Sequence, residues 1–152
     1  IAPVLAMRKA GITVGLGTDG ASSNNKLDMF AEMRLTALIH KAVSYDPKAI
    51  EAGEALDMAT REGAKCLGYD DLGELREGWL ADIILIDRSG FNWKPDFNDV
   101  SIAVYAANSR DVDTVIINGK PVMINKELLT IDTERLDYEV NRVVKELYGD
   151  LN

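Results

Sequence analysis

The spacing of apolar residues predicts helices in the first half of the chain. Apolar side chains recur every three or four positions over residues 27–43, which is the period of an amphipathic helix. Similar spacing predicts helices over 2–10 and 53–67. Residues 12–16 instead form a continuous apolar run with β-branched side chains, which predicts a buried strand. The polar residues 18–26 then predict a loop, so this half is expected to contain an α/β unit.

The second half has a different pattern that predicts strands. An apolar run predicts a strand within 79–87, and two further strands are expected at 114–117 and 122–124. Asn118-Gly119 joins the latter two, and this pair suits the two left-handed positions of a type I′ hairpin turn. A loop, a short helix and a closing helix are expected at 91–99, 100–107 and 133–148, respectively.

These patterns predict a division of the chain into two regions. The change falls between Gly68 and Gly78, so residues 1–68 form a helical α/β region and residues 69–152 a β-rich region with a closing helix. At the start of the helix over 27–43, Asn25 followed by Asp28 predicts an amino-terminal cap.

Composition limits the classes of partner. Of 152 residues, 47% are hydrophobic, which is enough to bury a core. The net charge of −8 disfavours nucleic acid and anionic membranes as partners. A single cysteine, Cys66, forms no internal disulfide, and no long apolar span is visible, so we expect a cytoplasmic protein. Because Ile1 is not an initiator methionine, we allow for further residues before it.

The segment from Gly15 to Gly20 has the G-x-G-x-x-G spacing of a dinucleotide-binding turn. In such a turn the helix begins at the glycines and faces a pyrophosphate, but here Asp19 would place a carboxylate against it. An acidic residue ending a second strand should follow about twenty residues later. That region, residues 38–41, lies inside a predicted helix, so the context argues against this interpretation.

The same segment is better interpreted as the end of a barrel strand, with Asp19 at the rim where catalytic side chains of such barrels lie. The run Gly15-Leu16-Gly17-Thr18-Asp19-Gly20-Ala21-Ser22-Ser23-Asn24-Asn25, continued by Leu27-Asp28 and Glu32-Met33-Arg34, resembles the eighth barrel strand and following loop of the amidohydrolase superfamily. The similarity is greatest to the branch of methylthioadenosine/S-adenosylhomocysteine deaminases and triazine chlorohydrolases. Later blocks resemble the β-rich segment after the barrel in these enzymes, at residues 73–78, 81–84 and 115–120.

The resemblance implies an α/β fold, in which residues 1–68 supply the last portion of a metal-dependent (β/α)₈ barrel and residues 69–152 a β-rich composite domain. It implies a divalent metal, zinc or iron, with Asp19 as a metal ligand and as the catalytic proton acceptor for an attacking water. The implied reaction is hydrolytic deamination of an adenine-containing nucleoside. Substrate choice lies outside these blocks, so removal of chloride or an amine from a triazine-like ring is an alternative.

The chain lacks most of the residues that this chemistry needs. A catalytic zinc site requires about three protein ligands, whereas the sequence has one histidine, His40, which we expect at the helix surface or the core edge. Cys66 has no histidine nearby in sequence and is expected to be a buried structural thiol. Ser22 and Asn24 are candidates for substrate contact, although such residues before a helix also serve turns and caps. We therefore expect the chain alone not to bind metal tightly.

Two hypotheses of different classes follow. In the first, the chain is the carboxy-terminal portion of a hydrolase acting on a small-molecule substrate. In the second, it is a non-catalytic structural module that contributes packing and oligomer contacts. A single barrel strand leaves both of its edges without neighbours, which favours pairing with another chain, so we expect a homo-oligomer.

Overall fold

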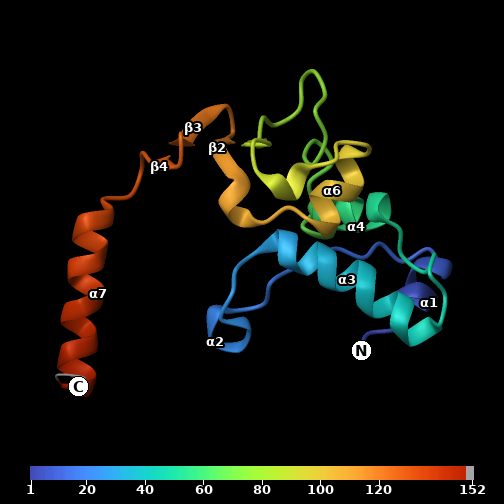
Figure 1. Cartoon of the computed structure of the whole chain (residues 1–152), viewed down its shortest axis with the longest axis horizontal. Helices are drawn as coiled ribbons and strands as arrows, with labels where there is room; N and C mark the ends of the chain where they lie inside the picture. Colours follow the sequence, from blue (N-terminus) through green and yellow to red (C-terminus); the bar gives the residue numbers. More distant parts are fainter. Residues whose placement is uncertain (150–152) are drawn as a thin grey trace.

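In a computed structural model, residues 1–149 are described as a group of helices beside a four-stranded sheet, with one helix at the far end (Figure 1). The α-helices are α1 (Val4–Lys9), α2 (Ala21–Asn24), α3 (Met29–Ser44), α4 (Ala52–Ala59), α5 (Arg61–Cys66), α6 (Asp99–Tyr105) and α7 (Thr133–Tyr148). The 3₁₀ helices are η1 (Phe91–Trp93) and η2 (Ser109–Asp111). The strands are β1 (Ile83–Ile86), β2 (Val112–Ile117), β3 (Lys120–Ile124) and β4 (Glu127–Leu128).

Helix α3 confirms the helix predicted over 27–43 and corrects its cap. Asp28 alone caps it, because its Oδ1 accepts hydrogen bonds from the backbone N–H groups of Phe30 at 3.0 Å and Ala31 at 3.3 Å. Asn25 instead ends α2, in a left-handed conformation with φ 55°. The predicted loop therefore contains a short helix of its own, and α3 begins one turn later than Asn25 would place it.

The helix predicted over 53–67 is interrupted at Thr60. Thr60 has φ −123° and ψ −95°, outside the helical region, so α4 ends before it and α5 begins after it. The turn after α5 brings Gly73 against this break, where a Cβ atom on Gly73 would lie 2.7 Å from the Cα atom of Arg61. Only glycine allows such a close backbone approach.

The strand predicted over 12–16 is not formed in this structure. A strand requires a neighbour that offers free backbone groups, and within residues 1–149 this segment pairs with no strand of the sheet. Its backbone instead bonds to helices: the N–H of Leu16 donates to the carbonyl oxygen of Met58 in α4 at 2.9 Å, and the N–H of Ile12 donates to that of Met7 in α1 at 3.0 Å. Val14 and Leu16 still pack against the core, whereas Ile12 is half exposed.

The sheet is an antiparallel meander with strand order β1-β2-β3-β4. Asn118 and Gly119 have φ values of 49° and 74°, both left-handed, which agrees with the predicted two-residue hairpin. Asp82, the residue directly before β1, connects this turn to β1, because its Oδ1 accepts a hydrogen bond from the N–H of Asn118 at 2.6 Å. The sequence pattern did not predict the short strand β4.

The core joins residues from both halves of the sequence. Ile50, Met58 and Val104 are completely buried, and Val104 belongs to α6, which packs on α3 and α4. Trp93 is also buried in this cluster, with its Nε1 donating to Asp111 Oδ2 at 3.2 Å. The helix predicted over 100–107 is thus confirmed as α6, and it completes the core of the first half. The division at residues 68–78 stays a prediction.

The closing helix is confirmed as α7, which stands apart from the body of the molecule (Figure 1, red). Its apolar stripe is exposed along most of its length, with Leu136, Val140 and Leu147 between 51% and 70% exposed. Among residues 1–149, no helix has the length and apolar character needed to cross a membrane.

We predict that Asp28→Ala lowers the free energy of unfolding by about 1–2 kcal/mol, the usual effect of losing an N-cap. Asp28→Asn should lower the free energy of unfolding much less, because asparagine caps helices as well as aspartate does. Urea unfolding followed by far-ultraviolet circular dichroism measures both. Equal losses in the two variants would contradict the capping role.

Candidate functional site

The loop after residues 12–16 presents Asp19 on the surface. Asp19 has φ 58°, in the left-handed region that aspartate tolerates better than most residues. Its Oδ1 accepts from the N–H of Gly20 at 2.7 Å, and its carbonyl oxygen accepts from Thr18 Oγ1 at 3.1 Å. The carboxylate is therefore held by its own turn while remaining open to solvent.

Helix α2 follows this turn directly and brings Ser22 and Asn24 into the same short stretch as Asp19. Asn24 Nδ2 donates to the carbonyl oxygen of Thr18 at 2.8 Å and to Glu32 Oε1 at 2.7 Å. Ser22 is exposed. Asn24 is thus engaged with the protein itself, and substrate contact by Ser22 and Asn24 stays a prediction.

Glu32 is the residue of this site whose role the sequence pattern did not predict. It lies in the first turn of α3 and is partly buried, and it meets Asn24 across the end of the loop. The two residues are eight positions apart, with a chain reversal between them. No helical or strand period predicts such a contact, because it depends on the exact path of the turn.

A surface hollow of about 560 Å³ lies beside the segment that leads to Asp19. Gly15, Leu16 and Gly17 line it, together with residues of α5 and the turn after it. A Cβ atom on Gly15 would lie 2.9 Å from the Cα atom of Gly63, so Gly15 permits close packing of the segment on α5. Close packing against α5 therefore explains the glycine at position 15 without a dinucleotide-binding turn.

Cys66 also lines this hollow, and its thiol is exposed. The prediction of a buried thiol is therefore wrong. Cys66 is the last residue of α5, next to the hollow rather than under the core, and its Sγ lies 3.8 Å from the carbonyl oxygen of Thr13.

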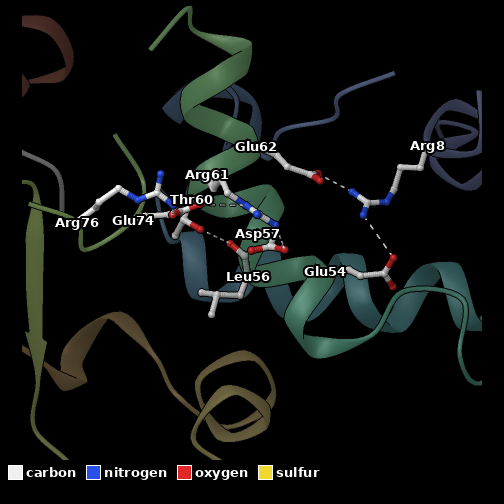
Figure 2. Close-up of polar contacts among 9 residues, drawn as sticks. All are labelled: Arg8, Glu54, Leu56, Asp57, Thr60, Arg61, Glu62, Glu74 and Arg76. Carbon is white, nitrogen blue, oxygen red and sulfur yellow. Dashed lines mark hydrogen bonds and ion pairs between the residues drawn. The ribbon is translucent and has the colours of Figure 1, made fainter. Parts of the chain in front are cut away.

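Half-exposed ion pairs connect the helices around this segment (Figure 2). Arg8 of α1 bridges α5 through Glu62 at 2.5 Å and α4 through Glu54 at 3.4 Å. A second group joins α4 and α5 to the following turn, through Asp57–Arg61 at 2.6 Å, Arg61–Glu74 at 3.7 Å and Glu74–Arg76 at 2.9 Å. Each such pair contributes little to stability by itself, but together they link α1, α4, α5 and the turn after α5.

The metal-binding donors within residues 1–149 do not gather into a metal site. Among residues 1–149, no group of three or more His, Cys, Asp or Glu side chains is placed to hold a metal ion. Asp19 offers one carboxylate, whereas a catalytic zinc site has about three protein ligands. Any metal bound at Asp19 would need further ligands from outside the described residues.

His40 lies on the buried face of α3, at 7% exposure. Burial lowers the pKa of His40 because it disfavours the charged imidazolium, and the positive amino terminus lowers it further. This placement agrees with the expected position at the core edge.

Comparison with known proteins now identifies the family. The model of the amidohydrolase family matches residues 1–122. The chain belongs to the amidohydrolase family. It is 47% identical over 147 residues to the 5-methylthioadenosine/S-adenosylhomocysteine deaminase of Dictyoglomus thermophilum, covering 97% of this chain and 34% of that protein. It is 53% identical over 146 residues to the enzyme of the same name from Acetivibrio thermocellus, covering 95% of this chain and 34% of that protein.

Two solved structures superimpose closely on this chain. A zinc-bound adenosine deaminase from Xanthomonas campestris superimposes with a TM-score of 0.92 at 36% identity, covering 96% of this chain and 34% of that one. A zinc complex of atrazine chlorohydrolase from Arthrobacter aurescens superimposes with a TM-score of 0.86 at 34% identity, covering 95% of this chain and 32% of that one. The amidohydrolase chain thus spans about one third of the length of these relatives.

We predict that the only histidine signal of this amidohydrolase chain titrates with a pKa below the usual value of 6.5. Because the unfolded state then binds the proton more readily, stability should fall as pH decreases below that value. His40→Gln should remove this component of the pH dependence. Nuclear magnetic resonance of the imidazole Cε1 proton measures the pKa, and an upward shift would contradict the effect of burial.

We predict that the purified 152-residue chain holds far less than one equivalent of zinc or iron after dialysis against metal-free buffer. One carboxylate binds such ions too weakly to retain them. Inductively coupled plasma mass spectrometry measures the ratio, with Asp19→Ala as the control for background metal. A stoichiometric ion lost in Asp19→Ala would show that the chain completes a site by itself.

Proposed function

We propose that this chain is the carboxy-terminal portion of a metal-dependent hydrolase that deaminates an adenine-containing nucleoside, methylthioadenosine or S-adenosylhomocysteine. The observation that carries the proposal is the Asp19 loop, which presents a carboxylate to solvent in a chain that is 53% identical to a deaminase named for these two substrates. The amidohydrolase family and these relatives support hydrolysis of a carbon–nitrogen bond that is not a peptide bond.

Asp19 is proposed as the group that carries the proton. In hydrolytic deamination, water adds to the ring carbon that bears the amino group, and the carbon–nitrogen bond then breaks to release ammonia. A carboxylate next to that carbon can accept the proton of the water and return it to the leaving nitrogen. Asp19 suits this role because its Oδ1 takes only a local hydrogen bond from Gly20, and the side chain stays open to solvent.

The complete protein is proposed to bind a divalent metal, zinc or iron, with Asp19 as one ligand. The zinc-bound structures of similar proteins support a metal in this family. The remaining ligands are proposed to come from outside residues 1–149, since no suitable donor group exists within them.

The proposed fold is that of a barrel enzyme. We place residues 12–16 at the position of the last strand of a (β/α)₈ barrel, which residues 1–68 help to form, and residues 69–152 in a β-rich composite domain. Support comes from the superposition on the deaminase structure at a TM-score of 0.92. In a complete barrel, neighbouring strands would supply the partners that residues 12–16 lack here.

A second candidate keeps the site and changes the leaving group. Several triazine hydrolase structures resemble this chain at 33–34% identity with TM-scores of 0.85 and 0.86. Displacement of chloride from a triazine ring by water needs the same activated water and the same carboxylate. The higher identity to the named nucleoside deaminases favours deamination.

We predict that the complete protein, loaded with zinc or iron, releases ammonia from methylthioadenosine or S-adenosylhomocysteine, and that Asp19→Asn lowers kcat by at least about 100-fold. The amide cannot accept the proton, and such transfers contribute about 10²–10⁴-fold to rate. An enzyme-coupled ammonia assay measures the rates, and chloride release from atrazine tests the alternative. Full activity in Asp19→Asn would refute its role.

A further inference from the structure

We propose that Asn24 is a positioning residue, which together with Glu32 holds the Asp19 turn on the first turn of α3. The amide group of Asn24 connects the loop to α3 through two hydrogen bonds. Its importance for catalysis rests on the proposed function, whereas its effect on the loop does not.

The contacts form a continuous path from α3 to Asp19. Glu32 Oε1 accepts from Asn24 Nδ2 at 2.7 Å, and the same nitrogen donates to the carbonyl oxygen of Thr18 at 2.8 Å. That carbonyl belongs to the peptide bond that joins Thr18 to Asp19, where φ is 58°. Asn24 thus holds the backbone at Thr18, directly before Asp19, and so helps to set the direction of the Asp19 carboxylate.

The path begins at a residue within a regular helix, α3. Glu32 lies in the first turn of α3, where a carboxylate interacts favourably with the amino-terminal end of the helix dipole. It is also partly buried, and its hydrogen bond to the neutral amide of Asn24 is charge-assisted and stronger than one between neutral groups. Asn24 is partly buried as well, so water competes less effectively for its amide.

The turn needs an external contact because its own bonds are local and exposed. Asp19 and Gly20 are exposed, and the hydrogen bond between Asp19 Oδ1 and the N–H of Gly20 joins adjacent residues. The left-handed backbone conformation of Asp19 is also intrinsically unfavourable, because Asp19 has a Cβ atom. Without Asn24, this turn has fewer constraints that select the observed conformation over extended ones.

The test uses amide hydrogen exchange of Gly20 in the ¹⁵N-labelled 152-residue chain. In Asn24→Ala, which removes both hydrogen bonds of this amide group, we expect the exchange of Gly20 to be about five- to tenfold faster, because each such bond adds modestly to the free energy of local opening. Glu32→Ala should act in the same direction, and the double variant should be no faster than Asn24→Ala alone. Glu32→Gln keeps the accepting oxygen and should restore slow exchange.

Lys26→Ala is the matched control, since it removes an exposed side chain two residues from Asn24. It should leave the exchange of Gly20 unchanged, and amides of the buried Ala37 and Ile50 report in every variant that the fold is intact. Unchanged exchange in Asn24→Ala would overturn the proposal, as would equal acceleration in Lys26→Ala.

A second measurement uses the complete protein. Asn24→Ala should lower kcat for the deaminated nucleoside by about tenfold or more, as expected for a misdirected catalytic group, with KM changed less than kcat. Glu32→Gln should keep most of the activity. Faster exchange of Gly20 with unchanged kcat would overturn the catalytic component of the proposal. If the unmodified complete protein releases no ammonia, the proposed function fails, while the exchange measurement still decides the role of Asn24 in the loop.

Discussion

The arrangement around the site depends on the two oxygens of one buried carboxylate. Asp28 Oδ1 caps α3, and Oδ2 accepts from Ser109 Oγ at 3.1 Å, 81 positions later in the chain. The cap sets the residue at which α3 begins, and the second contact ties that point to η2, after α6. Asp111 continues the connection inward, because its Oδ2 accepts from the indole of the buried Trp93. A short polar path therefore links the start of α3 to the core.

From this fixed point the site is positioned on two sides. On one side, Glu32 in the first turn of α3 holds Asn24, and Asn24 holds the backbone before Asp19. On the other side, the segment leading to the loop rests on α4 and α5, with Leu16 bonded to Met58 and Gly15 close against Gly63. Arg8 joins the helices there through Glu54 and Glu62 (Figure 2). Asp19 thus lies at the exposed junction of two independently supported pieces of chain.

The sequence predicted those elements whose signal is local. Helices α3 and α7 have apolar stripes of helical period, and Asn118-Gly119 determines its turn by its own backbone preferences. Features that depend on distant partners were missed or wrong. Residues 12–16 have a strand-like composition but no partner strand within residues 1–149. The break at Thr60 accompanies the approach of Gly73, and Cys66 is exposed beside a hollow. Asp19 was proposed from its place in a family motif, whereas the contact between Glu32 and Asn24 forms only after folding.

The position of Asp19 also has an electrostatic explanation. Within residues 1–149, Asp19 forms no ion pair, and its Oδ1 accepts from one backbone N–H group. A charged group without a partner cation remains stable only in contact with water, so its exposure follows from its charge. Within these residues, therefore, no neighbouring cationic side chain orients this carboxylate. Its direction has to come from the shape of the turn, through the left-handed backbone of Asp19 and the Asn24 contact. A loop built in this way can present the same carboxylate before any partner group arrives, and binding then needs less ordering at that step.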